Sequence, residues 1–198
     1  KKGIKTRQIV RKNSSIKESL KRMDIYRISL GDNNSLDKAL KGVDALIIAT
    51  GARASFDLTG PAKVDALGVY SQLESCKRVG VKRVILVSSL CTGKLIHPLN
   101  LFGFILIFKK LGENYLKDPY FDWTIVRPGG LKEDEEFATQ NILYSKMDSQ
   151  SQGSIPRRLV AKTCIEAFNC KQSIYKTIEI TSSDKNKKIS FKKAMQII

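Results

Sequence analysis

Apolar runs and amphipathic stretches alternate along the chain. The clearest run is residues 84–87, which is unbroken and largely β-branched, as in a strand buried on both faces. Other strand-like runs fall at residues 5–11, 25–30, 43–51, 121–128, 142–146 and 173–181. Helical patterns lie between them, at residues 14–20, 35–41, 59–79, 98–117, 156–168 and 189–198. This alternation predicts an α/β fold, a parallel sheet with right-handed crossovers and helices on both faces.

Several of the predicted strands end in residues suited to ligand contact, and ligands of open parallel sheets bind beyond these ends. The four ends are Arg11 with Lys12, Ala49-Thr50-Gly51, Ser88 with Ser89, and Pro128 to Leu131. Small residues let a flat ligand approach the backbone, and hydroxyls offer hydrogen bonds. Plainer roles stay open: the serines ending the strand and bonding local backbone, the glycine serving a tight turn, and the two cations facing only solvent.

The composition fits a single domain spanning residues 1–198, since a chain of 198 residues with 42% hydrophobic content has room for one core. The 35 Lys and Arg exceed the 19 acidic residues, for a formal charge of +16. The lysines are spread over predicted helix faces and the C-terminal tail without interleaved aromatic residues, so we expect no nucleic-acid partner. No apolar run reaches the roughly 18 residues of a membrane span. Four cysteines without a C-x-x-C pair predict reduced thiols and no metal site.

Three segments, taken in order, resemble the atypical short-chain dehydrogenase/reductase family. They are ATGARASFDLTGPAKVDALG (Ala49–Gly68), VSSLCTGKLIHPLNLF (Val87–Phe102) and FDWTIVRPGGL (Phe121–Leu131). Within that family the chain is most similar to the cyanobacterial and chloroplast branch, which includes the dehydrogenase-like domain of a chloroplast inner-envelope translocon subunit. The resemblance implies a Rossmann-type three-layer fold that binds NAD(P), in a chloroplast or in a cytoplasm of cyanobacterial type.

The resemblance also implies cofactor contacts. Asp32 is expected beside the adenine, Ala49, Thr50 and Gly51 along the ribose and pyrophosphate, and Pro128, Gly129, Gly130 and Leu131 beside the nicotinamide. Arg53, Ser88 and Lys109 are further expected cofactor contacts. Arg11 and Lys12 stand where NAD-preferring sites place an acidic residue for the ribose 2′-hydroxyl, whereas a base there suits the 2′-phosphate of NADP. A charge-assisted bond of about 1.5–3 kcal/mol would favour NADP over NAD roughly ten- to a hundredfold.

The family's first element has no counterpart in this sequence. Members begin with a strand and a turn of G-x-x-G-x-x-G type, whose helix N-terminus holds the pyrophosphate. Residues 1–11 instead resemble the end of that helix and the second strand, without an initiating Met, so we expect a natural start upstream and a fold lacking its first strand and helix. Because the missing strand would separate the strands at 5–11 and 43–51, both would have unpaired edges. We therefore expect this chain, expressed alone, to fold poorly.

A second departure concerns proton transfer. Active members use a Ser after the fifth strand and a Tyr-x-x-x-Lys, in which the Lys holds the ribose and lowers the Tyr pKa. Ser88 matches the Ser and Lys109 the Lys, so these are the expected catalytic residues, but Ile105 occupies the Tyr position. Tyr115 follows Lys109 on a different turn and is no substitute. The sequence therefore leaves open whether the protein is an enzyme.

Three functions remain. The protein is an NADPH-dependent reductase of a flavin, quinone or similar acceptor for which solvent supplies the proton, a non-catalytic NADP-binding redox sensor or assembly and scaffold factor, or an NmrA-like regulator that binds a dinucleotide and a protein partner. Weaker candidates have simpler structural interpretations. They are His97 as a general acid, Cys91 as a redox-sensitive thiol, Asp57 with Lys63 and Asp65 as a polar cluster, and the acidic run Glu133–Glu136 as a lid.

Overall fold

The structure is a computed structural model of the chain, and it describes residues 3–16, 24–29, 31–51, 59–92, 94, 96–101, 104–133 and 139–198. Three features singled out in the sequence lie outside the described residues: Arg53, Asp57 and residues 134–136 of the acidic run. Most of the helix predicted at 14–20 lies outside them as well.

Five strands form the main sheet, in the order β3-β4-β5-β9-β7. Their bounds are β3 (Ala45–Ile48), β4 (Arg83–Val87), β5 (Asp122–Pro128), β7 (Asn141–Lys146) and β9 (Lys176–Ser183). The neighbours β3, β4, β5 and β9 are parallel, and β7 runs antiparallel to β9. The carboxyl ends of β3, β4 and β5 therefore meet at one edge of the sheet.

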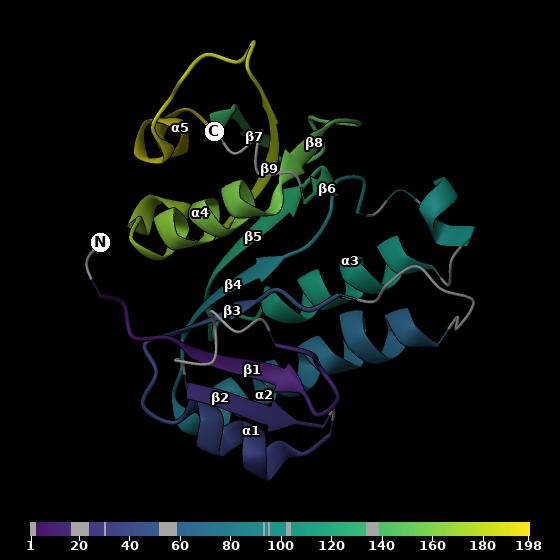
Figure 1. Cartoon of the computed structure of the whole chain (residues 1–198), viewed down its shortest axis with the longest axis vertical. Coiled ribbons are helices and arrows are strands. Elements are labelled where there is room, and N and C mark those ends of the chain that lie inside the picture. Colours follow the sequence, from purple (N-terminus) through teal and green to yellow (C-terminus); the bar gives the residue numbers. More distant parts are fainter. Residues whose placement is uncertain are drawn as a thin grey trace.

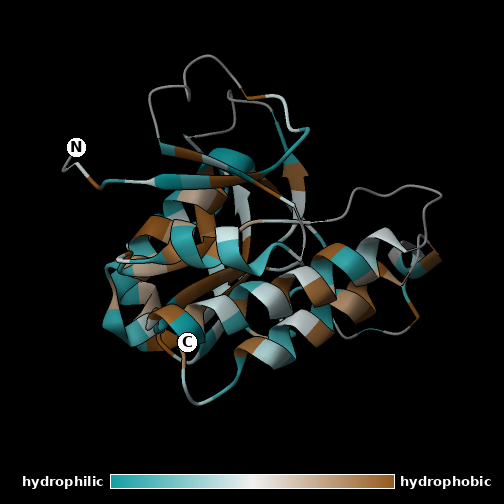
Figure 2. Cartoon of the chain, turned by 90° about the horizontal axis from the view of Figure 1, so that it is seen from below, coloured by the Kyte–Doolittle hydropathy of each residue, from teal (hydrophilic) through white to brown (hydrophobic). Residues whose placement is uncertain are grey.

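Helices cover both faces of this sheet (Figure 1). One face carries α1 (Asn33–Leu40), α2 (Gly68–Val79) and α3 (Ile105–Leu116), and the other carries α4 (Arg157–Phe168) and α5 (Phe191–Ile197). Leu86 and Ile125 belong to the core under α1 to α3, whereas Ile85 and Val126 belong to the core under α4 and α5. Figure 2 shows the helices in mixed brown and teal, as expected for helices with one apolar side. The predicted three-layer α/β fold is confirmed, with β7 as the antiparallel exception.

The first two strands form a sheet of their own. They are β1 (Arg7–Arg11) and β2 (Asp24–Ile28), which are parallel. Within the described residues, β1 pairs only with β2, and β3 pairs only with β4. Ile9, Tyr26 and Ile28 attach the small sheet to the core under α1 and α2. Among the described residues, the side-chain oxygen of Gln8, in β1, is the buried polar side-chain atom without a hydrogen-bond partner.

Two of the predicted helices are interrupted. The stretch at 59–79 contains a π-helical turn, η2 (Ala62–Leu67), directly before α2. A continuous helix over 98–117 is wrong, because a 3-10 turn, η3 (Pro98–Leu101), is separated from α3 by Phe104. Phe104 has a φ of +56°, in the left-handed region that ends or interrupts a helix.

Three short elements complete the described fold. A parallel pair that the sequence did not predict, β6 (Gly130–Lys132) with β8 (Ser154–Pro156), follows β5, and a 3-10 turn, η5 (Lys171–Ser173), precedes β9. No helix in the described part of the chain is both long and apolar enough to cross a membrane.

All four cysteines are free, in agreement with the predicted reduced thiols, and all four are buried: Cys76, Cys91, Cys164 and Cys170. Burial raises the pKa of Cys76 and of Cys164 to about 12, so both remain protonated thiols at neutral pH. Within the described residues, no group of three or more His, Cys, Asp and Glu side chains is placed to hold a metal ion.

Candidate functional site

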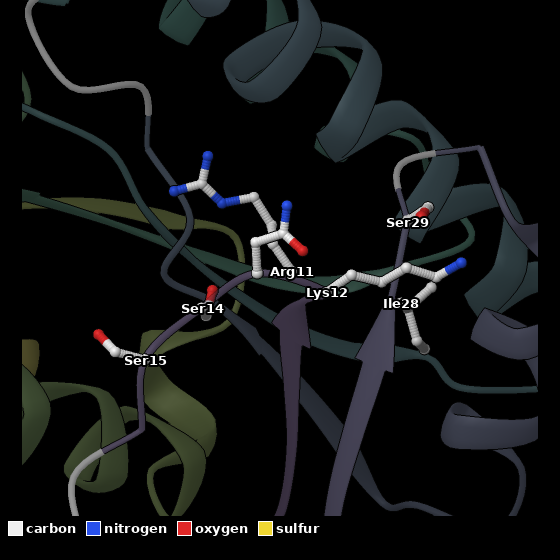
Figure 3. Close-up of a pocket in the computed structure, with 7 residues that line it drawn as sticks. Arg11, Lys12, Ser14, Ser15, Ile28 and Ser29 are labelled. Carbon is white, nitrogen blue, oxygen red and sulfur yellow. The ribbon is translucent and has the colours of Figure 1, made fainter.

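A cavity of about 630 Å³ opens at the carboxyl ends of β1 and β2 (Figure 3). Its lining residues are Arg11, Lys12, Asn13, Ser14, Ser15, Ile28 and Ser29. The Arg11 guanidinium and the Lys12 ammonium extend from one turn in different directions, and both residues are exposed. None of these lining residues carries a carboxylate, so the cavity presents cations, hydroxyls and an amide.

The turn of residues 11–14, which carries Arg11 and Lys12 and is called the basic turn below, is held by an arginine from the neighbouring strand. The amide of Ser14 donates to the carbonyl of Arg11 at 3.0 Å, which closes the turn. The guanidinium of Arg27, in β2, donates to the carbonyls of Lys12 and Ser14, each at 2.9 Å. Sequence patterns do not reveal Arg27, because nothing local shows that its side chain reaches the end of the adjacent strand.

Asp32, expected beside an adenine, is the N-cap of α1. Its Oδ1 accepts the amide of Ser35 at 3.1 Å. The hydrogen bonds from Ser35, and to a smaller extent the charge of Lys12, hold the pKa of Asp32 below its ordinary 3.8. The protein itself thus engages this carboxylate, close to the basic turn, and an adenine contact stays a prediction.

Beyond β3, the structure brings Gly51 and Lys109 together. A Cβ added at Gly51 would lie 3.5 Å from Nζ of Lys109 and 3.8 Å from Oδ1 of Asp65. Nζ of Lys109 lies 2.8 Å from the same carboxylate oxygen, and the exposed fractions of the two side chains are 15% and 3%. The sequence placed Asp65 in a polar cluster at the start of a helix, and the structure pairs it with the expected catalytic lysine.

The π-helical turn η2 carries Asp65 and packs tightly on α3. A Cβ added at Gly112, three residues after Lys109, would lie 2.4 Å from the backbone oxygen of Asp65. Only glycine permits the two segments to approach this closely. Because π-helical turns are rare and occur disproportionately at functional sites, the position of Asp65 fits a site role.

Ser88, directly after β4, is buried, with 7% of its surface exposed. Its hydroxyl lies 3.2 Å from that of Thr92, which donates to the carbonyl of Ser89 at 2.6 Å. The hydroxyl therefore stands at the strand end and also takes part in local bonds, and Thr92 is a neighbour that the sequence did not single out. Ile105, in the expected tyrosine position, is buried at the start of α3 and has no proton to donate.

The glycines after β5 have a packing role of their own. A Cβ added at Gly129 would lie 2.5 Å from the backbone oxygen of Gly153. The amide of Gly130 donates to this same oxygen at 2.9 Å. Pro128 is buried, whereas Gly130 and Leu131 are exposed. The close approach of two backbones accounts for Gly129, so a nicotinamide contact here stays a prediction.

A buried charge network lies behind the end of β5. The side chain of Arg127 is fully buried and makes two hydrogen bonds to Glu113 of α3, at 2.8 and 2.7 Å. It also donates to Asp148 at 2.8 Å and lies 3.6 Å from Glu179. Glu179 accepts the backbone amides of residues 148–150, at 2.9, 3.0 and 2.7 Å.

Arg127 keeps its charge in this network. Burial alone would lower the pKa of Arg127, but the hydrogen bonds and charge of Glu113, and then the charge of Asp148, raise that pKa above its ordinary value. Arg127 thus ties α3, which carries Lys109, to the turn after β7. Sequence reasoning missed the network, although an isolated charge within an apolar strand, as at Arg127 and Glu179, is a usable signal.

Comparison with known proteins gives one family and several relatives. Residues 1–171 match the family model described as NAD(P)H-binding. An uncharacterized chloroplastic protein of Arabidopsis thaliana is 39% identical over 157 residues, covering 75% of this chain and 55% of the relative. Protein TIC 62, chloroplastic, of Pisum sativum is 32% identical over 171 residues, covering 82% of this chain and 32% of the relative. Sanguinarine reductase of Eschscholzia californica is 28% identical over 198 residues, covering 80% and 72%.

The chain spans about half the length, or less, of the first two of these relatives. A solved structure from Bacillus halodurans, of the NAD-dependent epimerase/dehydratase type, has a TM-score of 0.79 and 26% sequence identity. The match covers 97% of this chain and 87% of that chain. The same fold therefore occurs in a protein named as NAD-dependent.

Proposed function

The chain belongs to the NAD(P)H-binding family, as its resemblance to atypical short-chain dehydrogenases/reductases implied, and from this premise we propose that it binds NADP(H) and reduces a conjugated acceptor such as a flavin or quinone. The name of one relative, sanguinarine reductase, supports the reaction type. Two relatives named as chloroplastic support a place in a chloroplast or in a cytoplasm of cyanobacterial type.

The basic turn beyond β1 is the observation that carries the choice of NADP. Arg11 and Lys12 line a cavity with no carboxylate among its lining residues, and the hydroxyls of Ser14 and Ser15 add further hydrogen-bonding groups. A guanidinium and an ammonium bind phosphate oxygens with charge-assisted hydrogen bonds. The 2′-phosphate of NADP would satisfy both cations, whereas the 2′-hydroxyl of NAD would not.

We extend the proposal to the rest of the dinucleotide, which we assign to the ends of the other strands. Ala49, Thr50 and Gly51 have little bulk, and a side chain at Gly51 would take up the space beside Lys109. We assign Lys109 to the ribose hydroxyls and the segment from Pro128 to Leu131 to the nicotinamide. The expected contact of Arg53 is part of the same proposal.

Bound nicotinamide would supply the hydride, and the residues around it suit an acceptor that needs no tyrosine. Ile105 cannot donate a proton, so the proton must come from solvent, as reduced flavins and quinones allow. We assign to the hydroxyl of Ser88, which lies 3.2 Å from that of Thr92, a hydrogen bond to a carbonyl oxygen of the acceptor. Ser88 and Lys109 are thus the proposed catalytic residues.

A second candidate is a non-catalytic NADP-binding domain that acts as a redox sensor or assembly factor. The ion pair between Lys109 and the buried carboxylate of Asp65 favours it, because that carboxylate competes with a ribose for the lysine. The isoleucine at position 105 favours it too. In this case NADP binds without turnover, and a protein partner recognises the domain when NADP is bound.

The two candidates are separated by mixing the purified protein with NADPH and a panel of flavins and quinones while following NADPH absorbance. The reductase consumes NADPH with at least one acceptor, and a Ser88→Ala variant slows that reaction. Saturable NADPH binding with no consumption across the panel selects the sensor. Failure to bind either dinucleotide contradicts both candidates.

Replacing Arg11 tests the choice of coenzyme. The Arg11→Ala variant should lower the ratio of NADPH affinity to NADH affinity roughly ten- to a hundredfold, since one charge-assisted bond to the 2′-phosphate is lost. Titration calorimetry with each dinucleotide measures this ratio. Lys5→Ala removes an exposed cation outside the cavity and is the matched control. An unchanged ratio in Arg11→Ala means that the arginine faces only solvent.

A further inference from the structure

The last strand of the main sheet, β7, borders an apolar groove. The groove has a volume of about 320 Å³ and is lined by residues of β7, of α5 and of the segment before α5. Figure 1 shows β7 and α5 near the C-terminus. Leu143, Ile189, Ile197 and Ile198 are among its apolar lining residues. Leu143 and Ile197 are exposed, by 45% and 62%. Two large apolar side chains therefore face solvent beside one concave surface.

The outer edge of β7 is open in the described part of the chain. β7 pairs with β9 on one side, from Asn141 opposite Ser183 to Lys146 opposite Ile178. No other described strand pairs with it. Alternate amides and carbonyls of an end strand point away from the sheet, where they are free to bond a further strand.

Five lysines lie on the segment of residues 185–193, which supplies part of the groove lining, and one of them, Lys187, lines the groove itself. They are Lys185, Lys187, Lys188, Lys192 and Lys193, all of them exposed. The only acidic residue between positions 184 and 198 is Asp184. Within the described residues, none of the five lysines forms an ion pair. The corner formed by β7, α5 and the lysines of residues 185–193 thus combines an apolar groove, an open strand edge and a local excess of positive charge.

We propose that this corner binds an extended acidic segment of a partner protein, which adds to the outer edge of β7 as a further strand. Main-chain hydrogen bonds to β7 would give the segment its direction and register. Apolar side chains on one face of the added strand would enter the groove, and acidic side chains would meet the lysines. The partner is therefore a segment in which apolar and acidic residues alternate.

The observations favour a protein segment over a membrane or a nucleic acid. A lipid surface offers no backbone groups for the open edge of β7, and a concave groove does not insert between lipids as protruding side chains do. A nucleic acid would use aromatic side chains for stacking, and the groove lining supplies only Tyr144, which is buried. Because β3 and β7 lie at opposite ends of the five-stranded sheet, the bound segment leaves the proposed dinucleotide site accessible.

Binding is tested on the purified protein with a short fluorescent peptide of alternating glutamate and valine. Fluorescence anisotropy should show saturable binding, weakened about tenfold by the double variant Lys187→Glu with Lys188→Glu. The matched control, Lys38→Glu with Lys41→Glu, makes the same charge change on the exposed side of α1 and should bind as the parent does. Leu143→Ser should also weaken binding several-fold, while urea unfolding of each variant shows an intact fold.

Two probes test the mode of binding. A peptide of the same sequence with N-methyl groups on alternate amides should lose binding, since it cannot donate to the edge of β7. Equal binding of the methylated peptide, or equal weakening by both double variants, overturns the proposal. So does binding of phosphatidylglycerol vesicles or single-stranded RNA, but not of the peptide, in a manner that depends on Lys187 and Lys188.

Discussion

The five-stranded sheet and the sheet of β1 and β2 each contain an arginine that holds a turn, and the two arginines do so in opposite surroundings. In the five-stranded sheet, Arg127 is fully buried and bonded to the carboxylates of Glu113 and Asp148. In the sheet of β1 and β2, Arg27 is exposed and donates hydrogen bonds to the carbonyls of Lys12 and Ser14. Water can replace the second set of bonds but not the first, because a buried charge has no other partner.

The strands around each arginine follow the same contrast. Ile125 and Val126, beside Arg127, are completely buried. The central residues of β1 are only half-buried, and Gln8 keeps an unbonded buried oxygen. Regions with few buried contacts open at low free energy, as ligand-binding segments commonly do. We conclude that the five-stranded sheet is the rigid part, and that the basic turn is the part a ligand can order.

Among the variants that test this difference between the two sheets, Arg127→Ala should lower the free energy of unfolding most. Removing one partner of a buried ion pair costs about 3–5 kcal/mol, because Glu113 and Glu179 stay buried without their counter-charge. Urea unfolding followed by circular dichroism measures the loss. Arg157→Ala, which breaks an exposed pair with Glu133, should cost less than about 1 kcal/mol. Similar losses of unfolding free energy in the two variants would contradict the interpretation that the Arg127 network makes the five-stranded sheet rigid.

Gly112→Ala should be the next most damaging change. Its Cβ would meet the backbone oxygen of Asp65 at 2.4 Å, so η2 must move away from α3, at a cost of about 1–3 kcal/mol. That movement should also disturb the pair between Asp65 and Lys109 and weaken NADPH binding. Gly3→Ala is the control, since a Cβ there meets nothing within 4 Å. Unchanged stability and NADPH affinity in Gly112→Ala would show that the contact is not needed.

The same contrast separates what the sequence could predict from what it could not. The succession of strands along the chain and the four strand ends were predictable, because an apolar run and the residues that stop it are local features. The bonds that fix these ends were not. The partners of Lys109 and Arg127 come from other elements, with Asp65 44 residues before Lys109 along the chain. The break of the helix at Phe104 depends on a single left-handed residue that no pattern announces.

The candidate site divides in a similar way. The resemblance led to Gly51 and Lys109, and the structure places them side by side. The contact of Gly129 with Gly153 lies between strands far apart in sequence, so a glycine expected to serve a ligand also serves packing. The end of a strand predicts where a site lies. The role of each residue there also depends on which other segments of the chain pack against it.

Replacing Arg27 tests the sheet of β1 and β2 and the basic turn that follows β1. Arg27→Ala should lower the free energy of unfolding by less than about 1.5 kcal/mol, since it removes exposed hydrogen bonds. It should nevertheless weaken NADPH binding several-fold, because the turn carrying Lys12 loses its support. Arg27→Lys keeps the charge but not the forked geometry, and should bind NADPH nearly as weakly. Full affinity in Arg27→Lys would mean that the charge acts and the support does not.

The smallest effect is expected at Asp32, next to the basic turn. Its folded pKa lies below the ordinary 3.8, so its carboxylate stabilises the fold above that pH, and the contribution is lost as pH falls through the lowered pKa. Asp32→Ala should therefore melt slightly below the parent at neutral pH, and the two melting temperatures should converge in acid. Asp32→Asn keeps an oxygen that caps α1, and should melt close to the parent at neutral pH. A difference between parent and Asp32→Ala that persists unchanged below the folded pKa would mean that the aspartate stabilises the helix by something other than its charged hydrogen bond to Ser35.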